Sequence, residues 1–452
     1  MNRKEFVRTG GMAAAAMAFG PSLTMLQAGD PRRVRMGVIG VGGRGQSHVD
    51  LLLRRSDVDL VAICDVEPHA LEDTRKMIAA SSKRMPQVFT GDAMAWKKLL
   101  EIRDGLDGVI IATPWEWHAP MVLGALEAGL RYVATEVILG LTVQEHWDVV
   151  KAAEKYQAHV MMLENVCYRR DVMAVLNMVR QGLFGELIHL QGGYQHNLRG
   201  VKFNNGYHGG PHGVEFGEKG YSEAHWRTNH SVHRNGDLYP THGIGPLANY
   251  ININRGNRFT TLASFSSKAR GLHDYILKWG GEHHPNAQVK FRLGDVVTTS
   301  INCANGETIL LQHDTDLPRP YSLGFRVQGT GGLWMDVSKT IYVDGQSAQE
   351  DEWDDEKTWL DKYDHPLWVR WSKETEGAGH GGMDFFVIHA FVESIKRGVP
   401  TPLDVYDAAT WSVLSPLSEQ SIQLGNQPVD VPDFTEGQWM FRQPVFALDD
   451  AF

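Results

Sequence analysis

The sequence has few cysteines, no excess of positive charge and no hydrophobic run long enough to cross a membrane. Its 3 cysteines lie far apart and form no CxxC pair, so the chain indicates neither a disulfide framework nor a zinc ribbon. A formal net charge of -10 argues against a nucleic-acid partner and against a basic membrane-binding surface. The composition is typical of a folded chain, since 42% of its 452 residues are hydrophobic, and this length favours two domains. We therefore expect a soluble two-domain protein that acts on a small molecule.

The first 30 residues have the pattern of an export signal. A basic start, Arg3-Lys4-x-Phe6, precedes a weakly apolar stretch over residues 11–26. This stretch is about 16 residues long, short of the roughly 20 that a membrane-spanning helix needs. The start resembles a twin-arginine signal with Lys4 in place of the second arginine, which leaves the general secretory route open. We predict export to the periplasm, with a disordered tail or a membrane anchor as the alternative.

A glycine motif lies between a predicted strand over residues 36–39 and a predicted helix over residues 46–55. In a dinucleotide-binding turn the first glycine makes the tight turn and the second lets the backbone approach a pyrophosphate. The third glycine lets the helix and the strand pack closely, and the helix N-terminus then favours the phosphate charge. The residues predicted to surround the cofactor phosphates are Gly40, Gly42, Gly43, Arg44 and Gly45.

Asp65 follows the next predicted strand, residues 58–64, about 25 residues after the first glycine. A carboxylate there can accept hydrogen bonds from both ribose hydroxyls of NAD, and it would repel the 2′-phosphate of NADP. Arg44 is a counter-argument, since an arginine near this position can hold that phosphate. We predict NAD as the cofactor, with a helix cap for the segment from Pro68 as the alternative role of Asp65.

Further strands are predicted over residues 108–112, 132–135 and 159–163, each followed by polar residues. The carboxyl ends of parallel strands converge on the ligand crevice of an open α/β sheet, so this repeated placement favours a site over isolated caps. The residues predicted for this crevice are Thr113, Trp115, Trp117, His118, Glu136, Val137, Glu164 and Asn165. Residues 31–182 are therefore predicted to form an α/β Rossmann domain.

Residues 183–452 are predicted to form an α+β domain with an open, mostly antiparallel sheet. Its C-terminal segment, with a helix over residues 383–396, is expected to pack partly back on the first domain, and the acidic stretch 349–364 is expected to be a surface loop. Segments with strand character are 185–194, 288–292, 297–301, 308–311 and 323–327.

The stretch 196–235 is rich in glycine, histidine and asparagine and is predicted to be a long functional loop with irregular backbone. Its histidines lack a helical metal-binding context, so binding of sugar hydroxyls or loop capping is favoured over a metal site. Directly after it, Tyr239 and His242 lie three residues apart at the start of a predicted helix, so both can face one crevice. The histidines of the stretch are His196, His208, His212, His225, His230 and His233.

Several motifs carry a resemblance to a known family. The glycine motif, Thr113-Pro-x-x-x-His118, residues 325–332 and His380-Gly-Gly-Met-Asp384 resemble the Gfo/Idh/MocA oxidoreductase superfamily. Within it, the sequence is similar to glycoside hydrolase family 109, the NAD-dependent α-N-acetylgalactosaminidases. The segments that carry this narrower resemblance are 114–118, 164–165, 225–227, 236–243 and 319–322.

The resemblance implies a glycosidase that hydrolyses terminal α-N-acetylgalactosamine with bound NAD in a redox-neutral cycle of oxidation, elimination, addition and reduction. A ketone at C3 of the sugar acidifies the C2 proton, so a side chain can remove it and no carboxylate pair is needed. His242 is then the principal base, Tyr239 its partner, and Tyr194 and Glu164 are supporting groups. The residues implied to contact the sugar are Tyr194, Arg227, Tyr239, His242 and Tyr321.

Two positions depart from the sugar dehydrogenases of the superfamily. The usual Glu-Lys-Pro is Glu136-Val137-Ile138 here, and Leu238 stands where an aspartate usually precedes the second-domain histidine. A simple dehydrogenase would lack its proton-handling pair, but it stays the alternative activity. An NAD-bearing binding protein is a third reading, against which Tyr239 and His242 argue. The expected partner is a glycoside or a glycan terminus, and analogy with open-sheet proteins suggests a homo-oligomer. The sugar, its anomer and the aglycone stay open.

Overall fold

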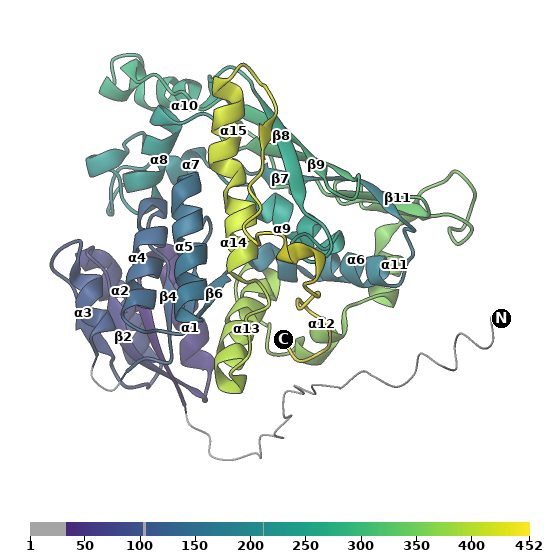
Figure 1. The fold of residues 1–452 in the computed structure, drawn as a ribbon. Coiled ribbons are helices and arrows are strands. Elements are labelled where there is room, and N and C mark those ends of the chain that lie inside the picture. The colour runs from purple at the N-terminus through teal and green to yellow at the C-terminus, as the bar shows by residue number, and fades with distance from the viewer. Residues whose placement is uncertain (1–32, 103–104, 211) are drawn as a thin grey trace, which may run out of the picture. The chain divides into compact units, whose positions relative to one another are not determined.

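The computed structural model describes residues 33–102, 105–210 and 212–452, which form one compact unit built on two β-sheets (Figure 1). The predicted export signal, residues 1–30, lies outside the described residues. None of the helices in the described part combines the length and the apolar character that crossing a bilayer requires.

The first sheet has six parallel strands in the order β3-β2-β1-β4-β5-β6. Every residue of its strands β4 and β5 is buried, as expected for a parallel sheet covered on both faces. Its strands are β1 (Val34–Ile39), β2 (Val58–Cys64), β3 (Gln87–Phe89), β4 (Gly108–Ile111), β5 (Tyr132–Thr135) and β6 (His159–Met162). The helices of this part are α1 (Gly43–Arg54), α2 (Pro68–Ala80), α3 (Ala95–Leu100), α4 (Trp115–Glu127), α5 (Val143–Tyr156) and α6 (Arg170–Arg180).

The second sheet has nine strands in the order β14-β13-β12-β11-β7-β10-β9-β8-β15, and only β7 and β10 pair in parallel. Burial alternates along β9 and β10, which indicates that one face of the sheet is packed and the other open. The predicted fold class is confirmed. The strands are β7 (Leu187–Gln195), β8 (Phe259–Ser266), β9 (Val296–Cys303), β10 (Thr308–Asp314), β11 (Arg326–Gly329), β12 (Gly332–Met335), β13 (Thr340–Val343), β14 (Asp354–Asp355) and β15 (Val429–Asp430).

Helices from the end of the chain return to the first sheet. In Figure 1 the yellow-green helix α13 and the yellow helix α14 lie beside helices of the first part, and α15 runs along β8. Phe391 and Ile395 of α13 press on β4 at Gly108, where a Cβ would come within 2.8 Å of Ile395. The helices of the second part are α7 (Arg199–Lys202), α8 (Glu223–His233), α9 (Thr241–Tyr250), α10 (Gly271–Gly280), α11 (Glu356–Lys362), α12 (Pro366–Trp371), α13 (Met383–Arg397), α14 (Val405–Ser412) and α15 (Leu414–Gln423).

Three local predictions are wrong. Part of the stretch expected to be irregular is helix α8, because residues 223–233 contain neither glycine nor proline and bury one face, with Arg227 among its residues. Residues 288–292 form no strand, since the amides of Arg292 and Leu293 bond the carbonyl of Ser231 at the end of α8. The acidic stretch contains helix α11, which Asp355 caps by accepting a hydrogen bond from the Lys357 amide at 2.8 Å.

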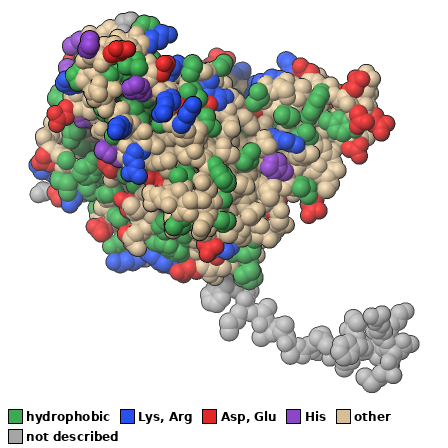
Figure 2. Space-filling model, turned by 90° about the horizontal axis from the view of Figure 1, so that it is seen from above, with side chains coloured by type: hydrophobic (Ala, Val, Ile, Leu, Met, Phe, Trp, Pro, Cys, Tyr) green, Lys and Arg blue, Asp and Glu red, His purple; other side chains and the backbone are tan. Residues whose placement is uncertain are grey.

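The loop after β13 carries much of the acidic surface at one end of the molecule. Figure 2 shows acidic side chains gathered at that end. The acidic residues of this loop are exposed, and they are Asp344, Glu350, Asp351 and Glu352.

Candidate active site

A cavity of about 600 Å³ lies at the carboxyl ends of the first sheet's strands and is completed by residues of β7, α8 and α9. Its position agrees with the rule that ligands of open α/β sheets bind outside the carboxyl ends of the strands. Most predicted site residues line it, with the exceptions of Gly45, Glu164 and Tyr321. Those that line it are Gly40, Gly42, Gly43, Arg44, Asp65, Thr113, Trp115, Trp117, His118, Glu136, Val137, Asn165, Tyr194, Arg227, Tyr239 and His242.

The glycine turn has the shape that a dinucleotide requires. Gly40 has φ +85°, and a Cβ there would lie 2.5 Å from the carbonyl oxygen of Ala112. A Cβ on Gly45 would lie 1.9 Å from the carbonyl oxygen of Gly40, so packing demands both glycines. Gly42 and Gly43 line the cavity with no atom within 4 Å of an added Cβ, and no side chain caps the N-terminus of α1. The open backbone and the free N–H groups therefore fit a pyrophosphate.

Asp65 is held at the side of the cavity by backbone hydrogen bonds. Its Oδ2 accepts from the Val41 amide at 2.7 Å and its Oδ1 from the Glu67 amide at 2.9 Å. Burial raises the pKa of Asp65, and these hydrogen bonds oppose that shift. The carboxylate therefore has a fixed orientation next to the glycine turn, where the ribose of a bound dinucleotide would lie.

His118 supports the shape of this edge of the sheet. Its Nε2 lies 2.7 Å from the carbonyl oxygen of Thr113, and its Nδ1 lies 2.6 Å from that of Ile138. Burial lowers the pKa of His118. The ring therefore joins the segments that follow β4 and β5.

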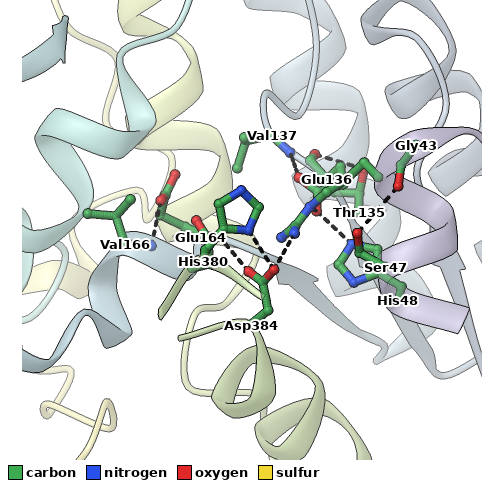
Figure 3. Close-up of polar contacts among 12 residues, drawn as sticks. Gly43, Ser47, His48, Thr135, Glu136, Val137, Glu164, Val166, His380 and Asp384 are labelled. Carbon is green, nitrogen blue, oxygen red and sulfur yellow. Dashed lines mark hydrogen bonds and ion pairs between the residues drawn. The ribbon is translucent and has the colours of Figure 1, made fainter. Parts of the chain in front are cut away.

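A charged cluster joins α1, β5 and α13 beside the cavity. Arg44 donates to Oε1 of Glu136 at 2.6 Å and to Oδ2 of Asp384, 340 residues away, at 2.7 Å. His48 donates to Oε1 of Glu136 at 2.6 Å, and His380 donates to Oδ2 of Asp384 at 2.7 Å. Figure 3 shows Asp384 with His380 on one side of the cluster and Glu136 with His48 on the other. Arg44, which could have held an NADP phosphate, instead pairs with protein carboxylates.

The cluster fixes the charges of its members. Burial alone would raise the pKa of Glu136, but Arg44 and His48 hold that pKa well below its usual range. Asp384 likewise has a lowered pKa, because its bonds to His380 and Arg44 outweigh burial. Burial and the charge of Arg44 lower the pKa of His48. Glu136 and Asp384 therefore stay ionised while His48 is neutral at neutral pH.

A second histidine–carboxylate pair lies on the other side of the cavity. His242, in the first turn of α9, donates through Nδ1 to Glu164, with distances of 2.7 and 2.9 Å to the two carboxylate oxygens. Glu164 follows β6, is 0% exposed, and also accepts from the Val166 amide at 3.1 Å. The His242 side chain is 15% exposed and lines the cavity, and within the described residues its Nε2 makes no hydrogen bond. Nε2 is therefore available to a ligand.

Two tyrosines surround His242. The ring centroids of Tyr194 and Tyr239 lie 5.2 and 4.9 Å from that of His242 and 4.8 Å from each other. Burial raises the pKa of both phenols, so both keep their protons at neutral pH. The hydroxyl of Tyr194 lies 3.0 Å from Nδ1 of His196. Tyr321 is 48% exposed, and its ring lies 6.4 Å from that of Tyr194, outside the lining of the cavity.

Arg227 forms a wall of the cavity together with aromatic side chains. Its guanidinium lies 5.1 Å from the ring centroid of Trp115 and 4.9 Å from that of Tyr239, and it pairs with Glu223 one turn earlier in α8. A planar cation between aromatic rings presents N–H donors beside apolar faces. Such a wall suits a polar ligand with an apolar face, such as a sugar.

Apolar side chains occupy the two positions that depart from the dehydrogenase pattern. Ile138 and Leu238 are buried in one small cluster with Trp115, and Val137 is buried at the cavity. Among the described residues, no lysine lines the cavity. The site therefore offers His242 and the tyrosines for proton transfer.

The histidines of the stretch 196–235 do not converge on one point. His196 contacts Tyr194, while His212 stacks on Trp279 with 3.8 Å between ring centroids. Across the part of the chain that the structure covers, no three histidine, cysteine, aspartate or glutamate side chains are grouped as metal ligands.

Sequence reasoning missed several residues of the site. His48 and Glu223 were not predicted, and the motif from His380 to Asp384 was noted for its resemblance alone. The signal that could have found Asp384 is that motif, whose aspartate sits in the first turn of a helix. The pairing with Arg44 bridges 340 residues, so no local pattern could show it.

A Rossmann sheet with this glycine turn, joined to a second sheet at a shared cavity, defines an NAD-binding enzyme with the Gfo/Idh/MocA oxidoreductase fold. The model described as oxidoreductase family, NAD-binding Rossmann fold, matches residues 34–164. The chain belongs to glycosyl hydrolase family 109, since the model of that family's C-terminal domain matches residues 168–441. The resemblance stated from the sequence is thereby confirmed.

Relatives of this family cover nearly the whole chain. A glycosyl hydrolase family 109 protein of Stenotrophomonas maltophilia is 56% identical to this chain. The matched region covers 100% of this chain and 99% of that protein. An α-N-acetylgalactosaminidase of Tannerella forsythia is 52% identical over 92% of this chain and 89% of its own. Among solved structures, a levoglucosan dehydrogenase in complex with NADH matches with a TM-score of 0.66 and 18% identity, over 89% of this chain and 100% of its own. At that identity the likeness concerns the fold.

Proposed function

We propose that this chain hydrolyses terminal α-N-acetylgalactosamine in a redox-neutral cycle with bound NAD, and that it does so after export to the periplasm. The observation that carries the proposal is the His242–Glu164 pair, which faces the same cavity as the glycine turn. The activity named for the Tannerella forsythia relative supports the choice of sugar.

The residues at the cavity suit proton removal from C2 of the sugar. When bound, NAD supplies the oxidation of C3 and its later reversal, and the C3 ketone acidifies the C2 proton. With its Nδ1–H donated to Glu164, the His242 ring can present the lone pair of Nε2 as a base. The buried carboxylate of Glu164 orients the ring and stabilises the imidazolium that forms. Loss of the C1 leaving group, addition of water at C1 with return of a proton to C2, and reversal of the C3 oxidation would then complete hydrolysis.

The two phenols assist this proton transfer. Because burial keeps Tyr194 and Tyr239 protonated, each can donate a hydrogen bond to an oxygen that gains charge at C3 or C1. Arg227 and Trp115 position the ring of the sugar from the side. Val137 stands where a net dehydrogenase of this fold would carry its lysine, which favours the proposal over that alternative.

The test uses nitrophenyl glycosides of both anomers, with absorbance of NADH followed in parallel. We expect nitrophenol release from the α-N-acetylgalactosaminide without added oxidant and without accumulation of NADH. Steady accumulation of NADH with a free sugar and no nitrophenol release would instead establish a net sugar dehydrogenase.

A further inference from the structure

The segment between α7 and α8 reaches from the second part of the chain to helix α2 of the first. Its Tyr207 ring stacks on His69, with 4.0 Å between centroids and 8° between planes. The Tyr207 hydroxyl donates to Asp73, with distances of 3.1 and 3.3 Å to the two carboxylate oxygens. In Figure 1 this teal segment lies near α2. A loop of one sheet domain is therefore anchored on a helix of the other.

Asn204, near the beginning of this segment, forms hydrogen bonds with Tyr221 near its end. Its Nδ2 donates to the carbonyl oxygen of Tyr221 at 2.8 Å, and its Oδ1 accepts from the Tyr221 amide at 3.0 Å. The backbones of Asn204 and Glu215 exchange two further hydrogen bonds of 3.0 and 2.9 Å. The ring centroids of Tyr207 and Tyr221 lie 4.8 Å apart, so Tyr221 packs directly against the residue that is anchored on α2.

Tyr221 connects this anchor to the cofactor side of the cavity. It lines the cavity together with Gly220 and Ser222, as do Asp65 and Glu67 at the start of α2. Asp65 indicates where the ribose attached to adenine would bind, because the acidic residue after the second strand of a Rossmann domain forms hydrogen bonds with that ribose. The anchored segment therefore borders the adenosine half of the groove.

We propose that His69, Asp73, Tyr207 and Tyr221 form a clasp that holds the adenosine half of NAD and slows its release. The proposal deepens the proposed function, since a redox-neutral cycle reuses one nucleotide and gains from its retention. Tyr221 lines the cavity and would contact the nucleotide directly, whereas His69, Asp73 and Tyr207 are positioning residues that act on the nucleotide through Tyr221.

The test measures release of the nucleotide from the full chain, with no glycoside present. Protein loaded with NADH is mixed with excess NAD, and the loss of energy transfer from tryptophan to bound NADH gives the dissociation rate. We expect Tyr207→Ala to release NADH about tenfold faster or more, since weakened retention acts mainly on dissociation. Tyr207→Phe, which keeps the stack and loses the bond to Asp73, should lie between Tyr207→Ala and the wild type.

Tyr342→Ala is the matched control, because Tyr342 is a tyrosine of the second sheet whose hydroxyl also bonds an aspartate, Asp344, at 3.3 Å. It should release NADH at the wild-type rate. Affinity for ADP-ribose should fall in Tyr207→Ala about as much as affinity for NADH, while nicotinamide mononucleotide binding stays unchanged.

Release of NADH at the wild-type rate from Tyr207→Ala would overturn the clasp. If that variant fails to fold, wild-type rates in both Tyr207→Phe and Asp73→Asn would overturn it equally. Because no glycoside is used, this outcome is separate from a failure of the proposed glycosidase activity, which nitrophenol release reports.

Discussion

The cavity has a histidine–glutamate pair on each side, and the two pairs differ in what surrounds them. In the first pair, Glu136 bonds both His48 and Arg44, a cation that stays charged, and the His48 side chain is 0% exposed. Within the described residues, Glu164 has hydrogen bonds only to His242 and the Val166 amide, and the His242 ring reaches the cavity.

This difference shows how the same two side chains can serve different purposes. Arg44 already neutralises the charge of Glu136, so Glu136 favours the imidazolium form of His48 only weakly. We therefore interpret the His48–Glu136 pair as a fixed structural element. A buried carboxylate whose one charged partner is a histidine stabilises the imidazolium directly, so Glu164 suits His242 for taking a proton from a ligand.

The largest effect is expected for His242→Gln compared with His48→Gln. His242→Gln should lower turnover by about 10²- to 10⁴-fold, the usual contribution of a general base, and leave the NAD content unchanged. His48→Gln should lower turnover by less than about tenfold and act mainly on stability. Turnover of protein with measured NAD content checks both, and equal losses in the two variants would contradict the distinction.

Arg44→Met should destabilise the protein by about 3–5 kcal/mol, because it leaves Glu136 and Asp384 buried without their shared cation. The lowered pKa values of both carboxyls mean that their stabilisation is fully present above the unfolded pKa of about 4, begins to fall below that pH and is lost completely only as pH falls through the folded pKa values. Urea unfolding at pH 7 and at pH 3.5 measures this. Arg44→Lys keeps the charge and should lower the free energy of unfolding by less than Arg44→Met does. Equal unfolding midpoints for wild type and Arg44→Met would contradict a stabilising role of the cluster.

Glu164→Gln should lower turnover by about 10- to 100-fold, because the imidazolium of His242 loses its buried carboxylate. Its binding of NAD should be unchanged. Glu136→Gln, the matched change in the other pair, should instead weaken NAD binding and stability. We thus expect Glu164→Gln to lower turnover but not NAD binding, and Glu136→Gln to lower NAD binding and stability. A loss of NAD in Glu164→Gln would show that the two pairs are not separate.

Asp237 is a further buried carboxyl, two residues before Tyr239 of the cavity lining, and it has no charged partner among the described residues. Burial raises the pKa of Asp237 to about 7, while the hydrogen bond that its carboxylate accepts from the Tyr239 amide opposes that shift. The folded state thus keeps its proton, and stability falls as pH rises from about 4 to about 7. Asp237→Asn should therefore be more stable than the wild type by about 1–3 kcal/mol at pH 8 and equal to it at pH 4. A difference that does not vary with pH would contradict this assignment.

The parts of the site that follow local rules could be predicted from the sequence. The glycine turn, Asp65 and Glu164 follow strands whose carboxyl ends must meet, and His242 stands in a recognisable motif. The position of Tyr321 at the rim and the pairing of Arg44 with Asp384 depend on how distant segments pack. Helix α8 escaped prediction because the stretch 196–235 is glycine-rich as a whole, although residues 223–233 contain no glycine.

The most direct test of the account is hydrolysis of an α-N-acetylgalactosaminide in deuterated water, with the sugar product analysed by NMR. If His242 removes the C2 proton and exchanges it with solvent, the released sugar carries deuterium at C2. A released sugar with only hydrogen at C2 would contradict the elimination route and the role given to the His242–Glu164 pair.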